Sequence, residues 1–313
     1  MKKIFIAVII FLSTLLFGCS TAEQYDIYVT TDPLQFLVEE IGKGVVSVGL
    51  IDGATAHNST VEWTGKKLIN LLNGDLLFYN GAGLDVYIDN EIKTNKNKKI
   101  ELYKMEDYIE FISSCFHHVH DDEPHTVSNE ACNESYKDPH FFLDPVLIKQ
   151  ASRVIYDVMF AKYIDYRNQI SENYYNLNTQ LDELISAYDD ALKNPQKPIL
   201  TTANLYGYYH ARYNIDSISI SNNDHSQNEI IKDYMLFVHE AKKHNIKYLI
   251  YEFNATSPYG DSIVNELNKT PGYNCEKLYF HTLEKLSKED KLNNRNYITI
   301  MYENLEVLKK ALE

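Results

Sequence analysis

Short apolar runs alternate with helical patterns along most of this 313-residue chain. Two sets of four runs have the length and composition of buried strands, and they cover residues 25–31, 46–51, 75–80 and 99–104, then 198–202, 217–221, 247–252 and 277–280. Helical patterns near residues 33–42, 66–74 and 85–93 separate the runs of the first set. Such alternation is typical of parallel sheets covered by helices. We therefore predict an α/β fold of two lobes, each with a four-stranded, mainly parallel sheet flanked by helices.

The sequence between the two sets has the pattern of one long helix. Six apolar residues recur at spacings of four and three and so share one helix face: Ile170, Tyr174, Leu177, Leu181, Leu184 and Tyr188. A helix over residues 170–194 would be roughly 37 Å long at about 1.5 Å per residue. An ordinary core-facing helix has the same face, but the position between the sets favours a rigid connection. We expect an N-terminal lobe over 25–162, a linking helix over 163–195 and a C-terminal lobe over 196–313.

The first residues have the pattern of a leader. Met1-Lys2-Lys3 precedes an apolar run from Ile4 to Leu16, which has signal-peptide length and is too short to span a bilayer. The run ends in Leu16-Phe17-Gly18-Cys19, which resembles a bacterial lipobox, where the cysteine is lipidated and begins the mature protein. An ordinary signal peptide with an incidental cysteine is the alternative. We expect a leader over 1–19, a tether over 20–24 and an extracytoplasmic protein, on the outer surface or in the periplasm, anchored by lipid at Cys19.

Net charge and cysteine content limit the kinds of partner and metal site that this chain can have. The net charge of −14 argues against nucleic acid and against a basic membrane-binding patch, and it suits a small cation. After Cys19 the chain has Cys115, Cys132 and Cys275, with no CxxC spacing that would favour a thiolate zinc site. An oxidising compartment would permit a Cys115–Cys132 disulfide, worth about 3 kcal/mol in the chain-entropy model. Cys275 would then be a free thiol of the core.

The segment Asp138-Pro139-His140-Phe141-Phe142-Leu143-Asp144-Pro145 is the strongest candidate for chemistry. Prolines flank the histidine on both sides, and a helical pattern begins near Val146. Proline restricts the backbone, so the imidazole of His140 is held in one direction, as a metal ligand must be. A lone histidine is more often structural, so the prediction depends on its neighbours.

Two further potential ligands follow predicted strands. His57 lies just after the second strand run of the first set, and Glu284 lies just after the last run of the second set. Ligands of open α/β sheets bind at the carboxyl ends of the strands. Each residue alone is explained as well by a solvated loop. Together, His57, His140 and Glu284 predict one metal site in the cleft between the lobes.

At this point the chain resembles the metal-binding receptor lipoproteins of zinc and manganese ABC importers. Four stretches carry the resemblance: residues 75–85 with their Asn-Gly-Ala-Gly-Leu turn, the Asp138–Pro145 element with Phe142 in place of tryptophan, the helical residues 170–194, and residues 297–305. The resemblance implies that His57, His140 and Glu284 are ligands of a zinc-type member. It also implies partners: a divalent metal, zinc rather than manganese, and the membrane subunits of an ABC permease, with the receptor acting as a monomer.

One position departs from the family pattern. The second lobe should carry a histidine or glutamate ligand before the turn at Tyr206-Gly207-Tyr208, but the matching residue is Ala203, which cannot coordinate a metal. Four residues could replace it: His225, His281, His210 and Asn204. We favour His225, which lies in a loop after a strand run, while water completing the metal shell is nearly as good an explanation.

A second group of histidines lies between Cys115 and Cys132. His117, His118, His120 and His125 alternate with carboxylates and resemble the His-rich loop of zinc-type members. We predict an accessory metal-collecting loop of lower affinity, because a flexible loop must be ordered when it binds. A solvated polar loop is the alternative.

The favoured function is therefore a non-catalytic receptor that captures zinc and delivers it to an importer. A mononuclear zinc hydrolase is the first alternative, because three protein ligands plus water form a catalytic site. The chain has no HExxH motif, since His239 and His244 are five residues apart. A surface adhesin or scaffold with a degenerate metal site is the second alternative.

Overall fold

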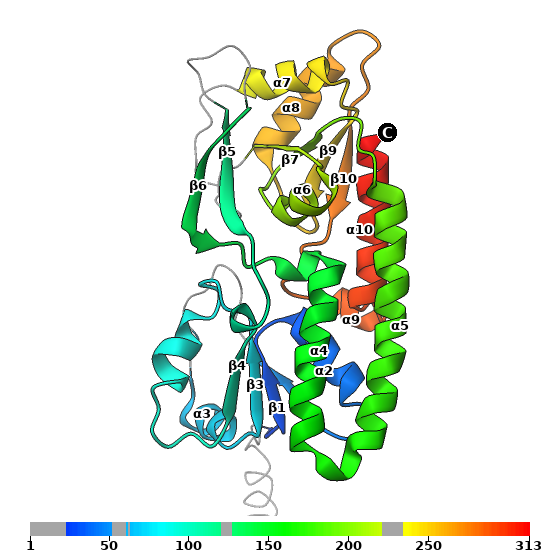
Figure 1. Cartoon of the computed structure of the whole chain (residues 1–313). Helices are drawn as coiled ribbons and strands as arrows, with labels where there is room; N and C mark the ends of the chain where they lie inside the picture. Colours follow the sequence, from blue (N-terminus) through cyan, green and yellow to red (C-terminus); the bar gives the residue numbers. More distant parts are fainter. Residues whose placement is uncertain (1–22, 52–60, 62, 120–126, 221–233) are drawn as a thin grey trace, which may run out of the picture.

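The computed structural model describes residues 23–51, 61, 63–119, 127–220 and 234–313. They form two lobes, one above the other in Figure 1. The lower lobe, lobe one, has a parallel sheet in the order β2-β1-β3-β4, with β1 (Ile27–Val29), β2 (Val48–Leu50), β3 (Leu76–Tyr79) and β4 (Glu101–Lys104). The upper lobe, lobe two, has the order β8-β7-β9-β10, with β7 (Ile199–Thr201), β8 (Ser217–Ser219), β9 (Tyr248–Glu252) and β10 (Glu276–Phe280).

The two sheets have the same strand order, in which the first strand lies between the second and the third. Seven of the eight predicted strand runs contain one of these strands, and the run over 277–280 covers all of β10 except Glu276. The prediction of two four-stranded parallel sheets in an α/β fold is therefore confirmed.

Helices cover the sheets: α2 (Asp32–Ile41), α3 (Gly65–Leu72), α4 (Pro145–Lys162) and α5 (Arg167–Leu192), then α6 (Gly207–Tyr213), α7 (Tyr234–Lys243), α8 (Pro258–Asn268), α9 (Lys288–Leu292) and α10 (Tyr297–Leu312). Several begin where the sequence supplies a cap. Ser257 caps α8 before Pro258, and reciprocal capping boxes begin α9 at Ser287 and α10 at Asn296. The helix expected near residues 85–93 is mainly a π-helical turn, Ile88–Ile92.

Helix α5 runs along both lobes, beside α10 on the right of Figure 1. Its buried face contains all six residues of the predicted pattern and also Leu192. The face packs against α2 and α4 of lobe one and against α10. The largest hydrophobic core therefore includes residues of both lobes, such as Val29, Leu181 and Phe280, without interruption at the boundary.

An antiparallel hairpin, β5 (Ser113–Val119) and β6 (Val127–Lys137), lies between β4 and α4. The metal-collecting loop predicted over residues 117–125 is therefore strand as far as Val119. The register pairs Cys115 with Cys132 across the two strands. The backbones of His117 and His118 lie in β5, whereas His120 and His125 lie outside the described residues.

Two other features bear on the sequence predictions. Cys275 is a free, buried thiol in the outer core of lobe two, and burial raises its pKa to about 11. Within the described ranges, the structure contains no helix that is both long and apolar enough to cross a membrane.

Candidate metal centre

The imidazole of His140 is almost fully buried, with 1% of its surface exposed, and it is held by a residue two positions earlier. Asp138 Oδ1 lies 2.7 Å from His140 Nδ1 and also accepts the backbone N–H of His140 at 2.9 Å. An ionised carboxylate accepts a hydrogen bond from Nδ1–H, and in a neutral ring protonated at Nδ1 the free lone pair is on Nε2. Metal-binding histidines are commonly oriented by a carboxylate in this way.

The peptide backbone around His140 is fixed from both lobes. Asn80 of lobe one donates to the carbonyl of Pro139 at 3.0 Å, and Tyr208 of α6 donates to the carbonyl of Asp138 at 2.7 Å. On the following turn, Tyr297 of α10 donates to the carbonyl of Phe142 at 2.9 Å. The ring of His140 therefore has little freedom to move relative to lobe two.

Asp144 ends the same element and has two roles. It caps α4 by accepting the N–H of Val146 at 2.9 Å, and it accepts a bidentate pair from Arg212 of lobe two, with Nε 2.9 Å from Oδ2. Burial raises the pKa of Asp144, and the guanidinium opposes that shift. The ion pair therefore joins the lobes directly beside the candidate ligand.

Glu284 approaches His140 from lobe two. It lies four residues after β10, and its Oε1 is 3.3 Å from His140 Nε2. Two ligand atoms about 2.0–2.2 Å from one tetrahedral zinc ion lie about 3.4 Å apart. A neutral His140 points an electron pair at a carboxylate oxygen here, and a cation between the two atoms satisfies both.

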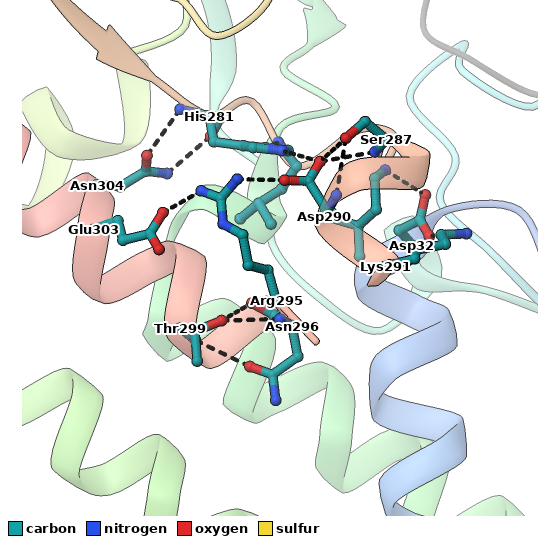
Figure 2. A network of polar contacts seen from close by, with 12 residues as sticks. Asp32, His281, Ser287, Asp290, Lys291, Arg295, Asn296, Thr299, Glu303 and Asn304 are labelled. Carbon is teal, nitrogen blue, oxygen red and sulfur yellow. Dashed lines mark hydrogen bonds and ion pairs between the residues drawn. The ribbon is translucent and has the colours of Figure 1, made fainter. Parts of the chain in front are cut away.

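His281 lies three residues before Glu284 and is buried, with both ring nitrogens engaged (Figure 2). Nδ1 accepts the backbone N–H of Leu283 at 2.9 Å, and Nε2 lies 3.4 Å from Asp290 Oδ2. Burial lowers the pKa of His281, against the effect of Asp290. Among the candidates for the missing ligand, His281 thus already has partners for both nitrogens.

The other predicted site residues either lie outside the described residues or have surroundings other than the His140–Glu284 pair. His57 and His225 lie outside the described residues. Ala203 is buried just after β7, where its methyl group belongs to the core. His210 lies on α6 with Nδ1 3.1 Å from Asp216. In the part of the chain that the structure describes, no three His, Cys, Asp or Glu residues are arranged so that together they could hold a metal ion.

Sequence reasoning missed the residues that orient the pair. Asp138 was visible in the motif, but its contact with Nδ1 was not assigned. Asp290 and Asn304, which hold the segment of Glu284, carry no signal in the local sequence, because their partner His281 is distant from them along the chain. The serine–aspartate spacing of a capping box, Ser287 to Asp290, is a signal that could have indicated an ordered turn there, although not the contact with His281.

The chain matches one family model, "ZnuA: Zinc-uptake complex component A periplasmic", over residues 27–311. The chain belongs to this family. Among curated members, the zinc-binding lipoprotein AdcA of Streptococcus pneumoniae is 24% identical over 318 aligned positions. The alignment covers 100% of this chain and 62% of AdcA, so the chain spans about three fifths of that relative. The high-affinity zinc uptake system protein ZnuA of Bacillus subtilis is 26% identical, with 94% of this chain and 89% of the relative covered.

Solved structures in the ZnuA family and its neighbours share the fold. The metal-dependent lipoprotein YcdH of Bacillus subtilis superposes with a TM-score of 0.73 at 22% identity, covering 91% of this chain and 98% of YcdH. The Zn(II)-bound ZnuA-like domain of Streptococcus pneumoniae AdcA gives 0.71 at 21%, covering 93% and 99%. The laminin-binding protein Lmb of Streptococcus agalactiae, titled a bifunctional protein with adhesin and metal transporting activity, gives 0.73 at 15%, covering 93% and 100%. At these identities the likeness is evidence of fold alone.

Proposed function

We propose that this chain is an extracytoplasmic receptor that captures a divalent transition metal, zinc before manganese, and delivers it to an ABC-type importer. One observation carries the proposal: His140 Nε2 and Glu284 Oε1, from opposite lobes, lie 3.3 Å apart, and Asp138 orients the imidazole. Family membership supports it, since the family model and the relatives AdcA and ZnuA are named for zinc. Imidazole with carboxylate suits zinc, whereas manganese prefers more oxygen ligands.

The complete ligand set in this proposal is His57, His140 and Glu284, with His225 or water in the place that Ala203 leaves open. An ion held in this way is cargo and not a catalyst. The names of the relatives describe binding and uptake, which supports a receptor over the zinc hydrolase.

The envelope location is also part of the proposal. We infer a leader over 1–19, lipid at Cys19, a tether over 20–24, and a monomer with lobes over 25–162 and 196–313 joined by residues 163–195. The name lipoprotein for AdcA supports the anchor. The membrane subunits of the importer would receive the ion, and nucleic acid is not a partner of so acidic a chain.

The hairpin adds two local proposals. The register that pairs Cys115 with Cys132 supports a disulfide, because directly paired antiparallel positions lie about 4.5–5.5 Å apart at Cα, within the range of disulfides. His117, His118, His120 and His125 would form the accessory site beside it. Changing all four histidines to alanine should remove weak zinc binding and leave the tight site intact.

Zinc titration of the purified full chain in detergent, against a chromophoric chelator, tests the main proposal. We expect one tight equivalent without hydrolytic activity, weakened in His57→Ala and His225→Ala. Binding should also weaken as the pH falls through the range in which histidines ionise, because a protonated imidazole cannot coordinate. His244→Ala removes a histidine far from the site in sequence and is the matched control. Full affinity in His225→Ala would assign the open position to water, and an absence of tight zinc binding by the wild type would refute the receptor.

A further inference from the structure

The turn that leads to Glu284 contains a residue in an unfavourable conformation. Leu283 has φ = +64°, in the left-handed region that glycine adopts readily and that residues with a side chain avoid. Its side chain is buried, with 1% exposed. The backbone direction at Leu283 decides where the next residue, Glu284, points. Something in the surrounding structure must therefore stabilise this turn.

His281 provides that stabilisation. Its Nδ1 accepts the N–H of Leu283 at 2.9 Å, which is the contact that an asparagine or aspartate oxygen makes in an Asx turn. Because Nδ1 is the acceptor, the proton of the neutral ring is on Nε2, facing Asp290 Oδ2 at 3.4 Å. The ring also stacks on Phe253, with centroids 5.3 Å apart. The peptide of His281 is fixed by Asn304, which accepts its N–H and donates to its carbonyl, both at 2.8 Å.

Asp290 is held as firmly as the imidazole it faces. It accepts the hydroxyl and the N–H of Ser287 and forms an ion pair with Arg295, which in turn pairs with Glu303 (Figure 2). Burial opposes ionisation of Asp290, but the hydrogen bonds from Ser287 and His281 lower its pKa to about 2. The carboxylate is therefore charged at neutral pH and fixes the proton of His281 on Nε2.

We propose that His281 is a positioning residue: its Nδ1 holds Leu283 in the left-handed turn that places Glu284 beside His140. The proposal rests on the proposed function, in which Glu284 is a zinc ligand. It assigns His281 to the support of the site, in place of the metal-ligand role considered from the sequence. Removal of an outer-shell partner typically weakens metal affinity about 10- to 100-fold.

Three substitutions separate the contacts of the ring. His281→Asn keeps an acceptor at the place of Nδ1, His281→Gln keeps a donor toward Asp290, and His281→Phe keeps only the stacking on Phe253. Zinc affinity of the full chain, measured by chelator competition, should fall about 10- to 100-fold in the Phe and Gln variants and stay near wild type in the Asn variant. In a Glu284→Gln background, His281→Phe should have no further effect, because the residue it positions no longer binds as a carboxylate.

The position of the proton on the His281 ring can be measured without zinc. Nitrogen-15 spectra of the metal-free wild type should show the proton on Nε2 of His281, and a proton on Nδ1 would overturn the proposal even if a variant failed to fold. Equal affinity losses in the Asn and Gln variants would also overturn it, as would a further loss in the Glu284→Gln background. If zinc affinity depends on Glu284 but not on His281, the receptor stands and the positioning role is wrong. If the wild type binds no zinc, the receptor fails and the positioning of a ligand fails with it.

Discussion

The two halves of the candidate metal centre are built in opposite ways. In lobe one, the direction of His140 is set within a few residues by Pro139 and by Asp138, whose carboxylate lies 2.7 Å from the ring. In lobe two, Glu284 follows the left-handed Leu283, and the turn depends on partners 9 and 23 positions from His281. The ring of the first half is therefore oriented by a local motif, although distant residues hold its backbone, whereas the supporting ring of the second half is itself oriented by tertiary partners. Substitutions of these tertiary partners should therefore disturb ring orientation in the second half more than in the first.

The largest effect should come from removing either ligand. His140→Ala and Glu284→Ala should each weaken zinc binding by about 1,000-fold, or about 4 kcal/mol, beyond the roughly 100-fold limit typical of outer-shell changes. Chelator competition measures both constants. The double variant should lose little more than either single one, since each leaves too few ligands. A loss in only one of the two would mean that the lobes do not share the ion.

The second prediction compares two buried carboxylates, one in each lobe, by how their effect on folding stability changes with pH. Burial raises the pKa of Asp85 in lobe one from an ordinary 3.8 to about 6, whereas hydrogen bonds lower the pKa of Asp290 in lobe two to about 2. Asp85 therefore contributes stability below about pH 4 that is lost as the pH rises through about 6, and Asp290 contributes stability above about pH 4 that is lost as the pH falls through about 2.

Urea denaturation of the metal-free chain measures this difference. Relative to wild type, Asp85→Asn should gain about 3 kcal/mol in free energy of unfolding between about pH 4 and pH 7, since one pKa unit corresponds to about 1.4 kcal/mol. As the pH rises from about 2 to about 4, Asp290→Asn should lose free energy of unfolding relative to wild type, because the wild type gains stability when Asp290 ionises. This change has the opposite sign to that of Asp85→Asn. If the free energies of unfolding of the two variants, relative to wild type, changed with pH in the same direction, the prediction would be wrong.

The third prediction concerns the ion pair that joins the halves. Arg212→Ala leaves the carboxylate of Asp144, itself 5% exposed, buried without its cation. Breaking such a pair costs about 3–5 kcal/mol when both partners are buried, and because Arg212 is 30% exposed we expect about 2 kcal/mol. Arg153→Ala, which breaks an exposed pair with Asp157, is the matched control and should cost under about 0.5 kcal/mol. Equal losses in thermal stability would show that the interlobe pair is no stronger than a surface pair.

The smallest of the four effects should follow from Asp138→Asn. The amide retains an acceptor for the N–H of His140 but removes the charge that makes the imidazole a better ligand. We expect zinc affinity to fall about tenfold, the lower end of outer-shell effects, with the melting temperature of the metal-free protein nearly unchanged. A tenfold loss here beside a larger loss in His281→Phe would show that the tertiary half is the more sensitive one.

Much of the fold could be predicted because its signals are local. Buried parallel strands are continuous apolar runs, so all eight were recognised, and the face of α5 repeats with helical spacing. The β5–β6 hairpin was missed because its sequence is rich in Ser, Cys, His and Asn, without a clear alternation of apolar and polar residues. Its strands are defined by their pairing with each other, which no single segment reveals.

In the candidate site, too, residues with a local sequence signal were predicted and residues defined by tertiary contacts were not. His140 and Glu284 were found from strand ends and from the family resemblance, and the structure brings them together, although their roles as ligands stay predictions. The left-handed Leu283 could not be foreseen, because leucine at that position gives no sign of positive φ, as glycine would. The role of Arg212 could not be foreseen either, because it contacts Asp144 only in the packed structure of the two lobes.

The uninterrupted core around α5 has a consequence for how this molecule unfolds. The helix has 26 residues with one continuous hydrogen-bonded ladder, and its apolar face is covered by helices on both sides of the lobe boundary. Unfolding of either lobe would remove contacts from the other, so we expect the lobes to unfold as one cooperative unit with a shared melting transition. An ion bound at the junction would then slow amide hydrogen exchange throughout the molecule, including amides at the far ends of both lobes.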